Sequence, residues 1–134
     1  MDNFSKAVDL LSSAMSATSL RYNVTANNLA NAEVPNFKRT NVNFESELKR
    51  VLQAKDDDFE MLATHPLHIR SEGNKDFRQV SPHLSVDYVT TSKANGNNVN
   101  AEEEAMNVLK TQLNYQLLSQ MQNFNFSQIR TVLK

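Results

Sequence analysis

The chain has 134 residues, enough for one ordinary domain, and its formal net charge is −1. That charge argues against nucleic acid or an acidic membrane as a partner, and the absence of cysteine excludes disulfides and thiolate zinc sites. Two glycines are too few for phosphate-cradling loops or nucleophile elbows, so the composition favours a long-helical protein that is not an enzyme and needs no cofactor.

Residues 1–33 are predicted to form one long helix. Apolar side chains recur at spacings of three and four residues, which is typical of a narrow packing seam of the heptad kind. This N-terminal row consists of Phe4, Val8, Leu11, Met15, Tyr22 and Leu29. Because Pro35 disfavours helical backbone at Val34, the helix should end near residues 31–33.

The same N-terminal stretch also bears on export. No apolar run in the sequence is long enough to cross a bilayer, so we expect no membrane insertion. The first twenty residues alternate apolar and polar side chains and lack the basic start of a cleaved signal peptide. If the protein leaves the cytoplasm, we expect a route that does not read such a signal.

Asparagine is frequent toward the end of this helix, at Asn23, Asn27, Asn28 and Asn31. It is a poor residue for a helix interior, because its amide competes for nearby backbone groups. An amide offers donors and acceptors without the desolvation cost of a charge. Such a row suits a face that is contacted in an assembly, and a simple exposed polar face fits the pattern equally well.

Residues 34–99 are predicted to form an irregular middle region. Helical spacing of Phe44, Leu48, Val51 and Leu52 indicates a short helix, and alternation at Leu84, Val86 and Tyr88 indicates one strand. The polar residues 93–98 are expected to be a linker into the last helix. The basic pair Lys38 and Arg39 is interpreted as solvated surface.

Two clusters in this region resemble metal sites only superficially. His65 and His68 have a helical spacing, but Pro66 lies between them and no third ligand is evident, so a local turn is favoured. The aspartates 56–58 lack the alternation and the glycine of a calcium-binding EF-hand loop, so a solvated charged loop is favoured. We therefore predict no metal site.

Residues 100–134 are predicted to form a second long helix, since they contain neither glycine nor proline. Asn100 is a good N-cap, and Glu103 stands where a capping box places its acid. The acidic run 102–104 complements the positive helix start, which explains it without catalytic carboxylates. The apolar C-terminal row consists of Met106, Leu109, Leu113, Leu117, Met121, Phe124 and Val132, and Leu118, Ile129 and Leu133 widen it.

Neither apolar row can be buried by its own helix. Helical stability comes mostly from packing such a face, so pairing of the two termini is the simplest solution. We predict a mainly α fold, an elongated coiled-coil-like hairpin of the two terminal helices with a small irregular middle containing a little β structure. The middle looks too small to cover both helices, so neighbouring copies should complete the burial.

Residues 26–39, ANNLANAEVPNFKR, resemble the N-terminal signature of the flagellar rod and hook protein family. The usual form is Asn-Asn-(Ile/Leu)-Ala-Asn-x-x-Thr-Pro-Gly-(Tyr/Phe)-Lys. The matching residues are Asn27, Asn28, Leu29, Ala30, Asn31, Pro35, Phe37 and Lys38. Val34 and Asn36 replace the usual Thr and Gly, and asparagine tolerates left-handed backbone better than most residues, so the turn can survive.

The resemblance covers the whole chain and implies a structural subunit of the proximal rod of the flagellar basal body, in the periplasmic space. Such subunits stack helically around an export channel and help to transmit torque. Their partners are copies of themselves, other rod and basal-body proteins and, transiently, the export apparatus, which they enter without a cleaved signal. The asparagine row would then serve contacts between neighbouring subunits.

Phe4 and Val8 resemble a short export element of the same family, and the alternative is that they are only the first positions of the N-terminal row. Another short rod protein of the family is the main rival, although its usual Ser-Arg-Ala-Tyr stretch is absent here. A generic helical scaffold or adaptor, and a small enzyme, are the remaining classes.

Overall fold

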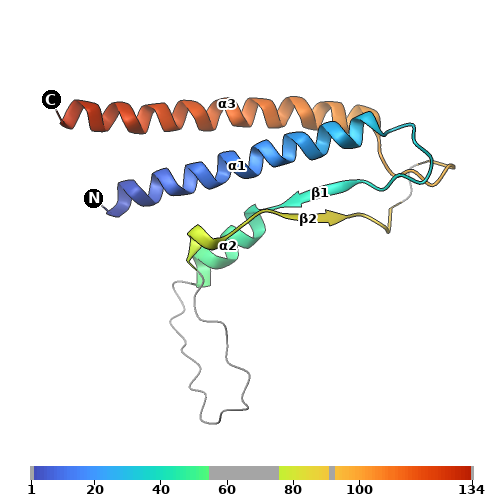
Figure 1. Ribbon diagram of the computed structural model, residues 1–134, viewed down its shortest axis with the longest axis horizontal. Coiled ribbons are helices and arrows are strands. Elements are labelled where there is room, and N and C mark those ends of the chain that lie inside the picture. The colour runs from blue at the N-terminus through green and yellow to red at the C-terminus, as the bar shows by residue number, and fades with distance from the viewer. Residues whose placement is uncertain (1, 55–75, 91–92, 134) are drawn as a thin grey trace, which may run out of the picture.

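The computed structural model describes residues 2–54, 76–90 and 93–133. Its elements in chain order are α1 (Asp2–Ala30), β1 (Thr40–Asn43), α2 (Glu45–Ala54), the short 3-10 helix η1 (Phe77–Gln79), β2 (His83–Val86) and α3 (Ala101–Val132). Figure 1 shows α1 and α3 side by side along the longest axis, with both chain ends at the same end. The predicted mainly α hairpin with a little β structure is confirmed.

The predicted ends of the long helices agree with local backbone chemistry. α1 ends at Ala30, and Asn36 then adopts a left-handed conformation with φ 60°, as the resemblance required of it. At the start of α3, the Asn100 side chain accepts hydrogen bonds from the backbone N–H groups of Glu102 and Glu103, so the predicted N-cap is confirmed.

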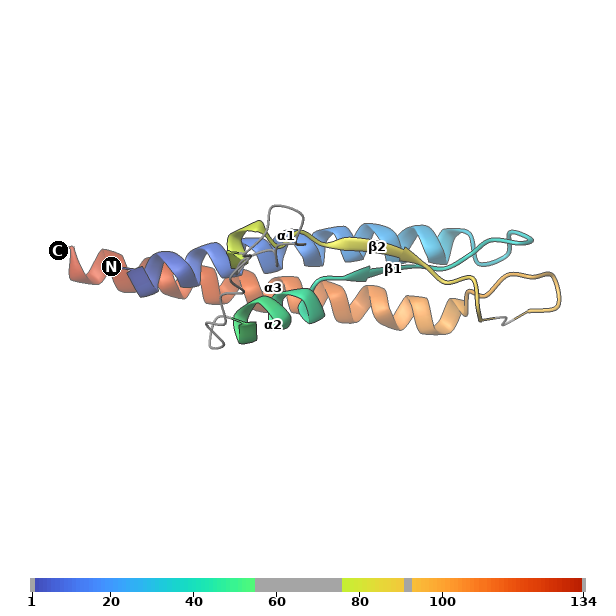
Figure 2. The same ribbon diagram turned by 90° about the horizontal axis from the view of Figure 1, so that it is seen from below.

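The middle region contains the predicted short helix, α2, and the predicted strand, β2. It also contains β1, which the sequence did not predict, and which pairs antiparallel with β2 in the register Thr40↔Val86 to Asn43↔His83. Figure 2 shows both strands running along the two long helices. β1 was missed because Val42 is its only apolar residue and asparagine is depleted in strands.

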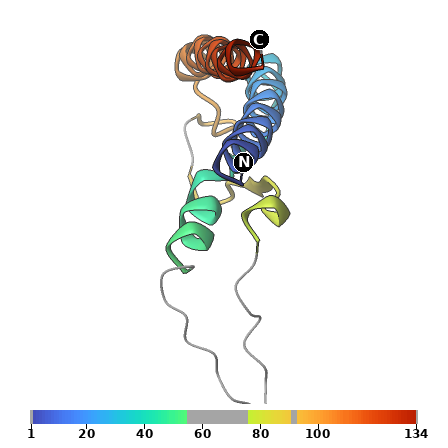
Figure 3. The same cartoon turned by 90° about the vertical axis from the view of Figure 1, so that its left-hand side faces the viewer.

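Two ion pairs attach the middle region to α1. Arg21 of α1 lies 2.6 Å from Glu45 at the start of α2, and Asp9 lies 2.7 Å from Arg78 of η1. Figure 3, which views the hairpin end-on, shows α2 and η1 at the opposite edge of the structure from α3. One side of α3 is therefore left without cover from the middle region.

The helices pack on each other through a row of α3 that differs from most of the predicted one. Its covered positions recur at spacings of three, four and seven residues, and half of those named here are polar. They include Glu104, Val108, Thr111, Leu118, Gln122 and Ile129, of which Leu118 and Ile129 were expected only to widen the C-terminal row. On α1, the N-terminal row is half-buried at Val8, Leu11 and Met15, whereas Tyr22 is exposed.

The predicted C-terminal row lies on the other side of α3, which we call the outer face. It comprises Met106, Leu109, Leu113, Leu117, Met121 and Phe124, with exposed fractions of 48–67%. The expectation that this row packs on α1 within one protomer is therefore wrong. Periodicity identifies an apolar stripe on a helix but not the surface that covers it.

Candidate functional site

The most deeply buried part of the described chain is where α1 ends and α3 begins. We call this region, residues 28–40 and 93–104, the junction. The four largest fully buried side chains of the described residues all lie in it, with exposed fractions of 0–1%. They are Glu104, Val99, Asn28 and Asn97. Three of these four are polar, so the junction depends on hydrogen bonds as well as on apolar packing.

Asn28 joins three elements. Its Nδ2 donates to the Thr40 carbonyl at 2.8 Å, and its Oδ1 accepts from the Thr40 N–H at 3.1 Å, so the amide pairs with β1 as a neighbouring strand would. The same Nδ2 lies 3.2 Å from Glu104 Oε2 of α3. The expectation that Asn28 contacts neighbouring subunits is therefore wrong, because its amide is used within the protomer.

The other asparagines of the row differ from Asn28 in exposure. Asn23 and Asn27 are exposed, and Asn31 is half-buried with its Nδ2 donating to the Asn27 carbonyl at 2.8 Å. Only Asn23 and Asn27 thus remain fully open to a partner.

Asn97, which precedes α3, forms hydrogen bonds with the backbone just after α1. Its Nδ2 donates to the carbonyls of Asn31, Ala32 and Val34 at 2.8–3.0 Å, and its Oδ1 accepts from the Val99 N–H at 2.7 Å. These carbonyls follow the helix, where the backbone lacks its regular partners. Residues 93–98 do link the middle region to α3, as expected, but the burial of Asn97 and Asn98 was not predicted.

Asn98 extends the same pattern toward the middle region. Its Oδ1 accepts from the Arg39 N–H at 2.7 Å, and its Nδ2 donates to the Asp87 carbonyl at 2.7 Å. Residues 95–100 contain four asparagines and only one apolar residue. This run of uncharged amides is the sequence signal that could have suggested buried amides here.

Arg39 and the acidic start of α3 form ion pairs across the junction. Arg39 Nε lies 2.9 Å from Glu104 Oε1, and Arg39 Nη2 lies 3.1 Å from Glu103 Oε1. The Glu104 side chain is only 1% exposed, so its charge depends on this guanidinium and on the Asn28 amide. The interpretation of Arg39 as a solvated surface residue was therefore wrong. The favourable interaction of an acidic residue with the start of a helix does not by itself explain Glu104, because Glu104 is buried in an ion pair.

Two left-handed residues meet at the tip of the junction. Asn36 has φ 60° and Gly96 has φ 79°, and the Asn36 N–H donates to the Asn95 carbonyl at 3.1 Å. A Cβ added to Gly96 would lie 2.6 Å from Asn36 Oδ1. Lys38 donates through Nζ to the Gly96 carbonyl at 2.9 Å, so this signature lysine also acts within the protomer.

Replacing Gly96 with Ala should lower the free energy of unfolding by about 1–3 kcal/mol, because a side chain at this positive φ is strained and the Asn36 amide must move. Urea denaturation measures the loss. The double variant Gly96→Ala with Asn36→Gly removes the clash between the new Cβ and the Asn36 side chain. The backbone strain at position 96 remains, so most of the loss in unfolding free energy should persist. An unchanged midpoint for Gly96→Ala would contradict the strained tip.

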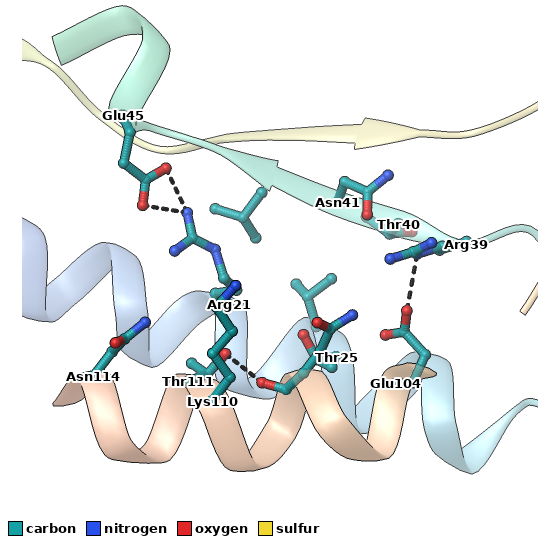
Figure 4. Close-up of a pocket in the computed structure, with 13 residues that line it drawn as sticks. Arg21, Thr25, Arg39, Thr40, Asn41, Glu45, Glu104, Lys110, Thr111 and Asn114 are labelled. Atoms are coloured by element: carbon teal, nitrogen blue, oxygen red, sulfur yellow. Dashed lines mark hydrogen bonds and ion pairs between the residues drawn. The ribbon is translucent and has the colours of Figure 1, made fainter. Parts of the chain in front are cut away.

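Beside the junction, α1, β1, the start of α2 and the first half of α3 line a polar pocket of about 320 Å³ (Figure 4). Its two carboxylates are both in ion pairs: Glu104 with Arg39, and Glu45 with Arg21. Burial raises the pKa of Glu45, but the hydrogen bond and charge of Arg21 and two backbone hydrogen bonds together outweigh it and leave the pKa below its ordinary value. Charges paired in this way hold elements together and do not provide a free acid or base.

The remaining predicted sites fall elsewhere. His65, His68 and the aspartates 56–58 lie outside the described residues, and within those residues no cluster of His, Asp or Glu could hold a metal ion. No helix in the described part is long and apolar enough to span a membrane. Phe4 and Val8 are half-buried in the first turns of α1, far along the helix from the junction.

Comparison with known proteins identifies the family. A family model described as "Flagella basal body rod protein" matches residues 9–38, most of α1 and the turn after it. Over the full length of both proteins, the chain is 33% identical to the flagellar basal body rod protein FlgB of Borreliella burgdorferi. It is also 30% identical to FlgB of Bacillus subtilis, over 99% of this chain and 97% of that protein. The chain therefore belongs to the FlgB family of flagellar basal body rod proteins and is a structural subunit of the rod.

Proposed function

We propose that the chain packs with copies of itself and with neighbouring basal-body proteins in the proximal rod, stacks helically around the export channel and helps to transmit torque. It does so as a structural protein without enzymatic activity. The observation that carries this proposal is the outer face of α3, where six large apolar side chains are 48–67% exposed. Contiguous exposed apolar surface of this kind marks interaction sites.

The charge pattern of α3 supports the same proposal. Residues 111–129 contain no charged side chain at all. These 19 residues correspond to about 28 Å of helix. A helix face that stays in water normally carries charged residues, so an uncharged and partly apolar face of this length suits burial against a neighbour.

Photo-cross-linking in cells tests this assignment. A photoreactive amino acid at Leu117 should yield adducts with copies of the chain or with other basal-body proteins. The same amino acid at Lys49, exposed on α2 at the opposite edge, serves as the matched control and should yield fewer. Equal yields at both positions, or none at Leu117 in assembled basal bodies, would contradict the proposal.

We also propose that the chain reaches the periplasmic space without a cleaved signal and contacts the export apparatus through Phe4 and Val8. Both side chains lie in the first turns of α1, at the end of the hairpin away from the junction. They are therefore available in an unfolded N-terminus without disturbing the buried contacts of the junction. The alternative is that they only begin the N-terminal row.

Deleting residues 4–8 should block secretion of the chain, and not only its assembly, because the proposed export element would be lost. The measurement is the amount of the chain outside the cytoplasm. A variant with Leu117→Asp, which leaves residues 4–8 intact, is the control and should still be secreted. Normal secretion of the deletion variant would mean that Phe4 and Val8 serve only helix packing.

A further inference from the structure

We propose that the junction, through Asn97, fixes the axial register of α3 against α1. The free ends of the two helices would then be positioned from the opposite end of the hairpin. This proposal concerns the single protomer and does not depend on its assembly into a rod. Asn97 acts here as a positioning residue, since it touches the end of α1 and is connected to the start of α3.

The contact between the long helices specifies their register only weakly. The buried residues of α1 are Ala17, Thr18, Thr25 and Asn28, which are small or polar, and the buried residues of α3 are Glu104 and Thr111. Beyond Thr111, the covered positions of α3 are only half-buried. Register in paired helices is set by interdigitating side chains and by buried polar pairs.

Directional bonds between the helices are concentrated at the junction. Among the described residues, the hydrogen bond from Asn28 to Glu104 is the one that joins a side chain of α1 to α3. A slide of one heptad, about 10 Å, would replace half-buried contacts by similar ones along most of the hairpin. The same slide would break the bonds of the junction.

The chain between Asn97 and α3 has little slack. Asn97 holds three carbonyls just past the end of α1, and α3 begins four residues later at Ala101. The two residues after Asn97, Asn98 and Val99, are buried, and the Val99 N–H bonds back to Asn97 Oδ1 at 2.7 Å. The start of α3 is therefore held at a fixed distance from the end of α1.

Asn97→Asp tests this arrangement. The carboxylate keeps an acceptor for the Val99 N–H but loses the amide donors and faces three carbonyl oxygens in a buried site. The matched control is Asn95→Asp, the same chemical change at an exposed neighbour whose Oδ1 only accepts a bond, from the Asn97 N–H at 3.1 Å. The control should retain the native contact.

Because the chain contains no cysteine, a pair of spin labels can be placed cleanly at the exposed positions Ser5 and Gln128 of the two helices. Pulsed electron paramagnetic resonance should give one narrow distance in the parent chain and in Asn95→Asp. In Asn97→Asp the distance should broaden or shift by about 5 Å or more, one helical turn, while circular dichroism still reports both helices. The native distance in folded Asn97→Asp, or a broad distribution in the parent chain, would overturn the proposal.

A second variant decides the question if Asn97→Asp loses its helices. Inserting two glycines after Val99 leaves Asn97 in place but gives slack between it and α3. The label distance should then broaden or shift in the same way. If the insertion variant keeps the native distance, the helices find their register without the junction, and the proposal is wrong.

Discussion

A chain with Leu117→Asp should fold almost as well as the parent chain but should be absent from the rod, and cells that depend on it should not swim. Leu117 is 57% exposed in the protomer, so the substitution should change the free energy of unfolding by no more than about 1 kcal/mol. If the outer face of α3 is buried in the rod, each subunit loses the burial of the exposed part of Leu117, about 1–2 kcal/mol. It must also desolvate or protonate a carboxylate, at a cost of several kcal/mol.

The measurement is threefold: urea denaturation of the purified chain, secreted protein, and basal bodies viewed by microscopy. Leu113→Asp should behave in the same way, since Leu113 lies one turn away on the same face. Leu117→Met, which keeps an apolar side chain of similar volume, is the control and should assemble. Intact rods that contain the Asp variant would show that this face stays in water.

Arg39→Met should destabilise the protomer itself, by about 3–5 kcal/mol, because it leaves the Glu104 carboxylate buried without its cation. Urea denaturation at pH 7 measures the loss.

The double variant Arg39→Met with Glu104→Gln removes the buried charge and should recover part of the loss at pH 7. A single variant as stable as the parent at pH 7 would contradict the buried ion pair between Arg39 and Glu104.

Features of the fold that depend on contacts between residues close in sequence could be predicted, and those that depend on distant residues could not. The ends of α1 and α3 were predictable because Pro35 and Asn100 act on backbone within a few residues. The junction was not, because Asn97 and Ala32 are 65 residues apart and nothing local says that an amide there is buried. β1 is also a non-local feature, since a segment with one apolar residue becomes a strand only beside β2 and Asn28.

The apolar rows illustrate a different limit. The spacing of Leu109, Leu113 and Leu117 correctly marks one face of a helix, but the choice of the covering surface depends on tertiary contacts. Within the protomer, a row that includes Glu104 and Thr111 is covered instead, since Arg39 pairs with Glu104 and the Asn107 carbonyl of α3 itself accepts a hydrogen bond from Thr111. The resemblance of residues 27–38 pointed to the right family, yet it did not show that Asn28 and Lys38 act within the chain.

Both chain ends lie at one end of the hairpin, and the hydrogen-bonded junction lies at the other. Each long helix is therefore held most firmly at one end, and the junction acts as its hinge. The 29 residues of α1 extend over about 44 Å. At that length, a change of about five degrees in the angle between the helices at the junction moves the far end by roughly 4 Å, about three-quarters of the pitch of a helical turn. A hinge built of directional, buried hydrogen bonds restricts that change in a way that apolar packing alone does not, because a hydrogen bond weakens steeply once its angle is lost.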